Sequence, residues 1–319
     1  MIVFHDPAEV PAGFGPSVVA IGKFDGVHTG HRAVIDRARV DAATGGARVV
    51  AVTFDRNPLA LLRPEVCPDN LIGVHQKLQL LAETGIDATL LLRFDRQLAD
   101  LPAREFVEHV LVGALGVRTV LVGRDFRFGR GGAGDPALLA ELGREFGFTV
   151  DVVDDVRAIE EGRRVSSTWI RELLTQGDVE TAAKLLGRMP SVWGEVVHGL
   201  KRGRELGYPT ANLSSECEGF VPADGVYAGW LIDEGSPDGL RRGIRYPAAI
   251  SIGTNPTFDD VPVRQVEAYV LDETDLDLYG HRVEIQFTAR IRGMVAFDGI
   301  EALVRQMADD VAQVRSALS

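Results

Sequence analysis

Cysteine is scarce in this chain of 319 residues, which contains only Cys67 and Cys217. The two lie far apart and in neither a CxxC pair nor a zinc-ligand spacing, which disfavours both a disulfide framework and a structural zinc site. No apolar run approaches the ~20 residues that a membrane-spanning helix needs, and residues 1–16 show no basic stretch followed by an apolar one, as a secretory signal would. Together these features predict a cytoplasmic protein.

Positive charge is also in deficit. Lys and Arg number 34 against 46 Asp and Glu, which gives a formal net charge of −12. Such a surface repels nucleic-acid backbones and anionic lipids at long range, so we expect neither nucleic acid nor a membrane as a partner. Any phosphate must therefore be bound by a local arrangement of groups. The proportions of charged (25%) and apolar (45%) residues exclude a disordered tail, a collagen-like fibre and a coiled coil.

The length suggests two domains, at roughly 100–200 residues each. In the first half, short β-branched runs alternate with segments of helical periodicity, which predicts an α/β domain with a doubly wound parallel sheet. The expected strands cover residues 18–21, 49–54, 88–92, 119–122 and 149–153. The expected helices between them cover residues 31–43, 74–84, 103–115 and 136–146.

Two further expected helices, 168–175 and 179–186, precede the helix-stopping residues GRMP at 187–190, so we place the domain boundary between residues 187 and 188. Beyond it, turns rich in Gly, Pro and Asp separate strands, which predicts an antiparallel β-barrel. These strands are expected at 192–197, 226–232, 248–252, 266–271 and 283–291. A terminal helix over 300–318 carries an apolar stripe that we expect to cover part of the barrel: Ile300, Leu303, Val304, Met307, Val311 and Val314.

A histidine motif follows the first expected strand, where residues 22–31 read GKFDGVHTGH and lead into the first helix. α/β proteins bind ligands at this edge of the sheet. His28 and His31, beside a helix N-terminus, would suit an α-phosphate that gains negative charge during in-line attack; turn and capping roles are the alternative. The motif resembles the signature of the FAD synthetases, of the HxGH nucleotidyltransferase superfamily. The resemblance implies that His28 and His31 are catalytic, and that four neighbours bind nucleotide: Gly22, Phe24, Asp25 and Gly26.

Two later loops extend the resemblance. Residues 53–58 (TFDRNP) and 123–129 (GRDFRFG) follow the second and fourth expected strands, at the same edge of the sheet. The family holds flavin and nucleotide there. The resemblance implies that Asn57 and Asp125 hydrogen-bond the ligand and that Phe126 and Phe128 contact it, while structural turns are the alternative.

Residues 164–171 (RVSSTWIR) resemble the family's SSTxIR element, in which hydroxyls, backbone amides and a guanidinium converge on phosphate. Helix capping explains one hydroxyl but not three followed by an arginine. The resemblance implies a catalytic Arg171 and phosphate contacts from four residues: Arg164, Ser166, Ser167 and Thr168.

Residues 129–134 formally match GxGxxG, but they lie too far from their strand and at the fourth crossover. We therefore interpret them as a mobile loop instead of a dinucleotide site.

The second half carries a glycine-rich segment, GLKRGRELGYPTANL at 199–213, which lacks the GK[ST] of a P-loop. Thr210 and Asn212 offer hard oxygen ligands on alternate residues, which suits Mg²⁺ bridging ATP phosphates. The PTAN motif at 209–212 resembles that of the riboflavin kinases. The resemblance implies that Glu267 is the catalytic glutamate, which would accept the proton of the ribityl 5′-hydroxyl. The resemblance further implies ligand contacts from seven residues: Gly199, Lys201, Gly203, Gly207, Thr254, Phe258 and Arg292. Residues 293–297 (GMVAF) lack the acid and lysine often found there.

The resemblance covers residues 15–316, with motifs in the expected order in both halves. It identifies the chain as a member of the bifunctional riboflavin kinase/FAD synthetase family. The implied path is riboflavin plus ATP to FMN plus ADP in the barrel, then FMN plus ATP to FAD plus pyrophosphate in the α/β domain, with Mg²⁺ at both sites. A flavin sensor without turnover and a single-activity adenylyltransferase are the rivals, and the presence of His31, Glu267 and an intact PTAN motif argues against them. Whether the protein is a homo-oligomer is left open.

Overall fold

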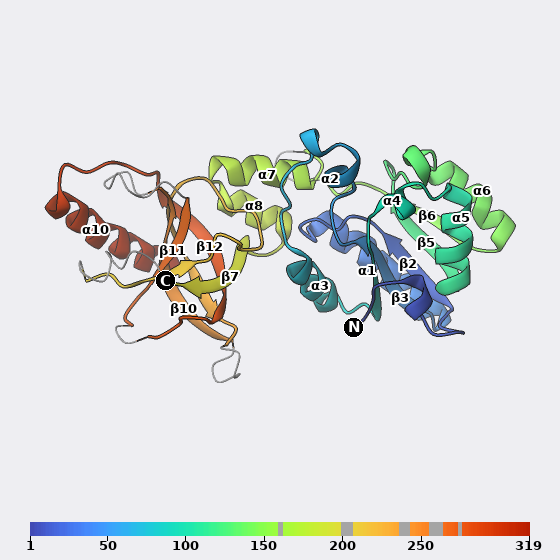
Figure 1. The fold of residues 1–319 in the computed structure, drawn as a ribbon, viewed down its shortest axis with the longest axis horizontal. Helices are drawn as coiled ribbons and strands as arrows, with labels where there is room; N and C mark the ends of the chain where they lie inside the picture. Colours follow the sequence, from blue (N-terminus) through green and yellow to red (C-terminus); the bar gives the residue numbers. More distant parts are fainter. Residues whose placement is uncertain (159–161, 199–206, 236–242, 255–263, 274–275) are drawn as a thin grey trace. The chain divides into compact units, whose positions relative to one another are not determined.

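The computed structural model describes residues 1–158, 162–198, 207–235, 243–254, 264–273 and 276–319 (Figure 1). The chain forms two compact units, residues 1–166 and 167–319. Both helices that precede the expected boundary, α7 (Ser167–Gln176) and α8 (Val179–Leu186), belong to the second unit. Gly187 ends α8 in the left-handed conformation, as its sequence context predicts. The boundary at 187/188 lies inside the second unit and stays a prediction.

The first unit is built on a six-stranded parallel sheet, so the predicted doubly wound sheet is confirmed. Its strands are β1 (Ile2–Phe4), β2 (Ser17–Ile21), β3 (Arg48–Phe54), β4 (Ala88–Leu92), β5 (Val117–Gly123) and β6 (Thr149–Val153). In space they follow the order β1-β4-β3-β2-β5-β6. The chain order reverses between β2 and β5, and the carboxyl ends of strands at such a point are where open α/β sheets bind ligands.

The crossover segments include four long helices. They are α1 (Thr29–Gly45), α3 (Val74–Glu83), α5 (Ala103–Phe106) with its continuation η3 (Val107–Ala114), and α6 (Pro136–Phe146). The connections also hold five short helices that the sequence pattern did not indicate. They are η1 (Pro7–Glu9), α2 (Pro58–Leu62), η2 (Pro64–Val66), α4 (Arg96–Ala99) and η4 (Arg130–Gly132). The pattern also missed β1, because a three-residue edge strand gives no periodicity to recognise.

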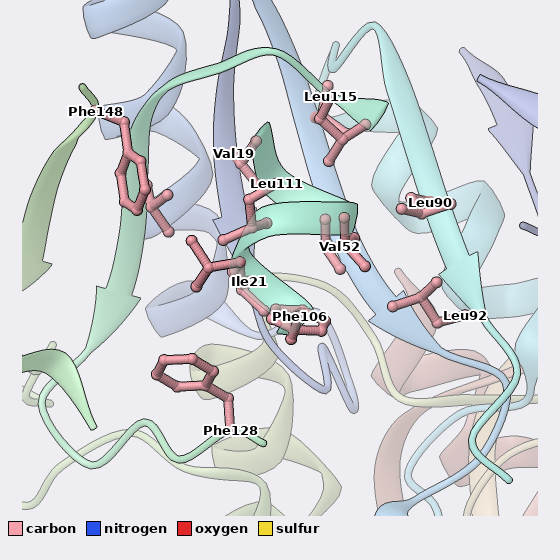
Figure 2. Packing of buried hydrophobic residues seen from close by; sticks show 14 of the residues in the cluster. Val19, Ile21, Val52, Leu90, Leu92, Phe106, Leu111, Leu115, Phe128 and Phe148 are labelled. Carbon is pink, nitrogen blue, oxygen red and sulfur yellow. The ribbon is translucent and has the colours of Figure 1, made fainter. Parts of the chain in front are cut away.

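The core of this unit lies between the sheet and its helices. Figure 2 shows Val19, Ile21, Val52, Leu90 and Leu92 of the central strands facing side chains of α5 and η3, all within one buried cluster. Every residue of β2 and β4 is buried. Because central parallel strands are covered on both faces, their sequences are continuously apolar instead of alternating.

The second unit contains a closed antiparallel barrel, as predicted. Its strands are β7 (Ser191–Val197), β8 (Thr210–Leu213), β9 (Gly225–Asp233), β10 (Ile244–Gly253), β11 (Gln265–Val270) and β12 (Arg282–Arg292). They close in the order β10-β11-β8-β7-β12-β9. In β11, buried residues alternate with half-buried ones, so one face fills the barrel and the other points outward.

The terminal helix α10 (Ile300–Leu318) covers part of the outer face of the barrel, as expected. Val314 packs against Ala228 of β9 and Leu271. Ile300 is 56% exposed, so the apolar stripe makes contact over less of the helix than its sequence suggested. Within the described ranges, no helix is both long and apolar enough to cross a membrane.

We predict that Gly229→Ala destabilises the barrel. An added Cβ would meet the backbone oxygen of Gln286 at 2.0 Å and Ile250 Cδ1 at 2.5 Å. Such overpacking lowers the free energy of unfolding by about 1–3 kcal/mol. The tryptophans, Trp169, Trp193 and Trp230, all lie in the second unit, so urea unfolding followed by tryptophan fluorescence measures this change.

Gly293→Ala is the matched control, because the atom nearest its added Cβ, Arg290 Nη2, would be 3.7 Å away. We expect the control to unfold at the urea concentration of the unsubstituted protein. Equal midpoints for both variants would contradict the predicted clash.

Candidate functional site

The loop after β2 is held in a strained conformation. Phe24, Gly26 and Val27 have φ angles of 48°, 90° and 40°. Positive φ is costly for a bulky or β-branched residue and persists only where the surrounding structure enforces it. Phe24 and Val27 are fully buried, which supplies that enforcement. The loop therefore delivers His28 to the start of α1 in one fixed position.

His28 and His31 form a stacked pair at this helix end. His28 is the capping residue of α1, and its Nδ1 accepts a hydrogen bond from the His31 backbone N–H at 3.3 Å. Because Nδ1 is the acceptor, the proton of the neutral ring lies on Nε2, which becomes a donor. The two ring centroids are 3.7 Å apart with 16° between the planes. Gly30 makes room for this stack, since a Cβ there would lie 3.1 Å from the His28 ring.

The electrostatic environment of His31 is positive. Burial is the largest cause that holds the pKa of His31 well below its usual value, followed by the charges of His28, Lys77, Lys23 and Arg164. Among the described residues, the buried His31 Nδ1 has no hydrogen-bond partner. Buried polar atoms are normally satisfied, so an unmatched one among positive groups suits a ligand atom. These positive surroundings are the kind of local arrangement by which a protein of net charge −12 can attract phosphate.

The residues predicted in neighbouring loops are engaged with one another or with the backbone. Asn57 caps α2 by accepting from Leu59 N at 3.1 Å. Arg164 donates to both carboxylate oxygens of Asp125, at 3.0 and 3.2 Å, and pairs with Asp155 at 3.0 Å. The hydrogen bond from Arg164 lowers the pKa of Asp125 below its usual value. The structure thus joins two predicted ligand residues from segments 39 residues apart.

The two predicted aromatic residues stack on each other. The ring centroids of Phe126 and Phe128 are 5.4 Å apart, and their planes differ by 13°. Phe128 belongs to the core and lies 6.0 Å from Phe106. Phe128 also exchanges two backbone hydrogen bonds with Gly134, which closes the GxGxxG segment into a tight loop. Ligand contact by these rings stays a prediction.

The SSTxIR element spans both units. Val165 O would lie 3.7 Å from a Cβ at Gly30, so the segment ending at Ser166 runs beside the start of α1. Its other predicted residues, Ser167, Thr168 and Arg171, lie on α7 in the second unit. Their contact with phosphate stays a prediction.

The barrel brings three oxygen-bearing side chains together on β8 and β11. Glu267 is directly opposite Asn212 across the two strands. Thr210 Oγ1 donates to Glu267 Oε2 at 3.3 Å, and Asn212 Nδ2 donates to Thr210 O at 3.3 Å. Burial raises the pKa of Glu267, and the Thr210 hydrogen bond offsets part of that rise. The sequence singled out all three residues but did not indicate that the PTAN segment is itself a strand.

This set of donors fits a magnesium ion. Mg²⁺ prefers hard oxygen ligands and commonly binds one or two protein groups together with substrate phosphates. A hydroxyl, an amide oxygen and a carboxylate supply such ligands. In the part of the chain that the structure describes, no three His, Cys, Asp or Glu side chains are grouped to hold a metal, and a site completed by ATP phosphates does not need such a group.

Of the other predicted barrel residues, the structure describes Gly207, Thr254 and Arg292. Gly207 turns the chain with φ 85° before β8, and Thr254 follows the last residue of β10. Arg292 forms a two-bond ion pair with the buried Asp310 of α10, at 2.8 and 2.7 Å, so it joins helix to barrel. The remaining predicted residues, Gly199, Lys201, Gly203 and Phe258, lie outside the described residues.

Sequence reasoning missed one charged residue near the histidines, Lys77. It lies on α3 and is 7% exposed. It belongs to no motif, but a signal was present, because it interrupts the apolar face that Val74, Leu78 and Leu81 form at helical spacing. A lysine on a buried face is rare unless its charge is paired.

Comparisons with known proteins relate each half of the chain to a known family. The sequence model described as FAD synthetase matches residues 12–169, and the one described as riboflavin kinase matches residues 186–318. A bifunctional riboflavin kinase/FMN adenylyltransferase from Escherichia coli K12 is 36% identical over 298 residues, which cover 93% of this chain and 91% of that protein. One from Listeria monocytogenes is 36% identical over 304 residues, covering 94% and 91%. A crystal structure titled as a macrolide-efflux protein from Streptococcus pneumoniae has a TM-score of 0.82, with 31% identity and 98% coverage of both chains.

We predict that His31 titrates well below the ~6.5 of an ordinary histidine, because burial and four neighbouring positive groups disfavour its charged form. NMR titration of the histidine ring carbons in the ligand-free protein measures the midpoint, and His31→Gln assigns the signal. In Lys23→Gln the His31 midpoint should rise, because one of those positive groups is removed. A His31 midpoint at or above 6.5 would contradict this description of the pocket.

Proposed function

The chain belongs to the family of bifunctional riboflavin kinase/FMN adenylyltransferases, and from this premise we propose which of its residues perform the two reactions. The barrel half phosphorylates riboflavin to FMN with ATP, and the parallel-sheet half joins FMN to AMP from ATP, which gives FAD and pyrophosphate. The observation that carries the assignment of residues is that each half assembles its own motif. His28 and His31 stack at a helix N-terminus, and Thr210, Asn212 and Glu267 meet across two strands.

In the kinase reaction, Glu267 acts as the general base. The 5′-hydroxyl oxygen of riboflavin forms a bond to the γ-phosphorus of ATP, the bond from that phosphorus to ADP breaks, and the hydroxyl proton passes to the Glu267 carboxylate. Burial raises the pKa of Glu267, which brings the base closer to neutral pH and strengthens it as a proton acceptor. The hydrogen bond from Thr210 orients the carboxylate.

Thr210 and Asn212 would hold Mg²⁺ beside this base. When bound, the ion supplies positive charge to the transferred phosphate and its neighbour. In this proposal Lys201 and the glycines at 199, 203 and 207 bind the ATP phosphates. Thr254 and Phe258 contact the flavin, and Arg292 contributes a ligand contact.

In the adenylyl transfer, the attacking group is already an anion. A phosphate oxygen of FMN forms a bond to the α-phosphorus of ATP, and the bond from that phosphorus to pyrophosphate breaks, so no proton has to be removed. The site therefore supplies alignment and positive charge. His28 donates through Nε2, and His31, Arg164 and Arg171 stabilise the charge that develops on the α-phosphate.

The other groups of this half hold the substrates. Gly22, Phe24, Asp25 and Gly26 form the loop against the nucleotide. The hydroxyls of Ser166, Ser167 and Thr168 contact phosphate, and Asn57, Asp125, Phe126 and Phe128 contact the ligand. We also propose that Mg²⁺ accompanies ATP at this second site. The protein is proposed to be cytoplasmic and to have no nucleic-acid partner.

The proposal predicts that the two activities can be lost separately. We expect His31→Ala to abolish FAD formation and leave FMN formation, and Glu267→Ala to abolish FMN formation from riboflavin and leave FAD formation from added FMN. The reason is that the two residues belong to separate compact units. Incubation with riboflavin or FMN, ATP and Mg²⁺, followed by chromatography of the flavins over time, measures both. Loss of both products in either variant would show that the assignment is wrong.

The raised pKa of Glu267 predicts the pH dependence of the kinase. The base works only when deprotonated, so kcat/KM for riboflavin should fall as the pH drops through the folded-state pKa, which lies above the ordinary glutamate value of about 4.3. Thr210→Val removes the hydrogen bond that lowers this pKa, so the acid limb should move to higher pH. Thr210→Ser keeps the hydroxyl and should leave the limb in place. Profiles are measured at saturating Mg²⁺, and an unmoved limb in Thr210→Val would refute the role of the hydrogen bond.

A further inference from the structure

Lys77 carries a buried positive charge that the reaction described above does not use. It lies on α3, is 7% exposed, and its Nζ donates to the backbone oxygen of Phe54 at 2.8 Å. Burial lowers its pKa, while the negative charges of Asp25 and Asp55 act against that lowering. A methionine of similar length would fill the same space with no charge to desolvate. Packing alone therefore does not explain a lysine here.

The groups around Lys77 lie at the carboxyl ends of two adjacent strands of the sheet, β2 and β3. Phe54 is the last residue of β3, Asp55 follows it, and Asp25 lies in the histidine loop after β2. Asp25 Oδ1 accepts from Leu71 N at 2.8 Å, and Asp55 Oδ1 accepts from Phe94 N, beyond β4, at 2.9 Å. The ammonium thus lies near the connections that leave the carboxyl ends of β2 and β3, which are neighbours in the sheet. Asp55 links this group to the segment after β4.

Two of these connections carry predicted substrate-binding residues. The loop after β2 holds His28, and the loop after β3 holds Asn57. The loop after β2 has positive φ at three of four consecutive residues, so it needs contacts from outside to keep its shape. One charge thus interacts with Asp25 in the first loop, and with Asp55 and Phe54 O at the start of the second.

We propose that Lys77 is a positioning residue for adenylyl transfer: its buried ammonium holds the histidine loop and the Asn57 loop at the spacing that aligns FMN with the α-phosphorus of ATP. The inference rests on the function proposed for the histidine site. Lys77 acts through its neighbours and touches no reacting atom. The positive charge of Lys77 also contributes to keeping the pKa of His31 low, so Lys77 lies close enough to act on the histidine pair.

The test compares Lys77→Met and Lys77→Arg with a matched control, Gln79→Met, on the exposed face of the same helix. A loss of alignment acts on the transition state more than on binding. We expect Lys77→Met to lower kcat for FAD formation from FMN by about 10- to 100-fold, with little change in the KM for FMN. Lys77→Arg should recover at least part of the rate because it restores the charge. FMN formation from riboflavin, and all activities of Gln79→Met, should be unchanged.

Three results would overturn the proposal. The first is a fall in kcat smaller than about fivefold in Lys77→Met, relative to the order of magnitude expected from misalignment. The second is a rise in KM with unchanged kcat, which would make Lys77 a binding group. The third is a folded Lys77→Arg protein as slow as Lys77→Met. If Lys77→Met melts below the assay temperature, Lys77→Gln, which keeps a donor for Phe54 O without the charge, is judged by the same limits.

Failure of the site assignment itself is recognised separately. If His31→Ala forms FAD at the unsubstituted rate, the histidine site is not where adenylyl transfer occurs, and the result concerns that assignment. If His31→Ala is inactive in FAD formation and Lys77→Met is fully active, only the role of Lys77 is wrong.

Discussion

Removal of water from a few ionisable side chains is the constraint on which both sites depend. Burial is the largest cause of the shifted pKa of His31, of Lys77 and of Glu267. Desolvation disfavours the charged form, so it pushes the histidine and the lysine downward and the glutamate upward. The same physical effect thus produces a neutral imidazole in a cationic pocket and a carboxylate that is a stronger base than in water. If His31 were less buried, it would be protonated more easily, and if Glu267 were less buried, it would be a weaker base.

The two units bring their site residues together in different ways. In the parallel sheet, every connection that leaves a carboxyl end emerges at one edge, so residues distant in sequence, such as Asp125 and Arg164, meet there. In the barrel, the register between two strands sets the site, because Glu267 faces Asn212 and the alternation of side chains puts Thr210 on the same side. A slip of one residue between β8 and β11 would move Glu267 to the opposite face. The sheet site depends on loop conformation and the barrel site on register.

These differences explain how much the sequence revealed. Long periodic segments such as α10, and the apolar runs of β2 and β4, are predictable because burial on one or both faces determines their composition. The motif residues of both sites were also predictable, because unusual residue types recur there at fixed spacing. Strand β8 was missed, since its four residues read as a motif instead of a strand. The contact between Thr210 and Glu267 depends on barrel closure, and the pairing of Lys77 with two loops depends on the sheet order. Neither is encoded within one segment.

The ion pairs of Arg164 show how the cationic pocket remains compatible with ligand. The guanidinium is held by two carboxylates, but unequally, since the Asp125 side chain is 69% exposed and that of Asp155 only 25%. An exposed ion pair contributes about 0–1 kcal/mol, because water and salt screen it. In the proposed phosphate site, exchanging Asp125 for a ligand phosphate would therefore cost little, while the less exposed Asp155 would keep the guanidinium oriented. Arginine suits this exchange, because its planar group offers several donors in fixed directions and can serve a carboxylate and a phosphate at once. The internal carboxylate thus balances the charge of the pocket without blocking it.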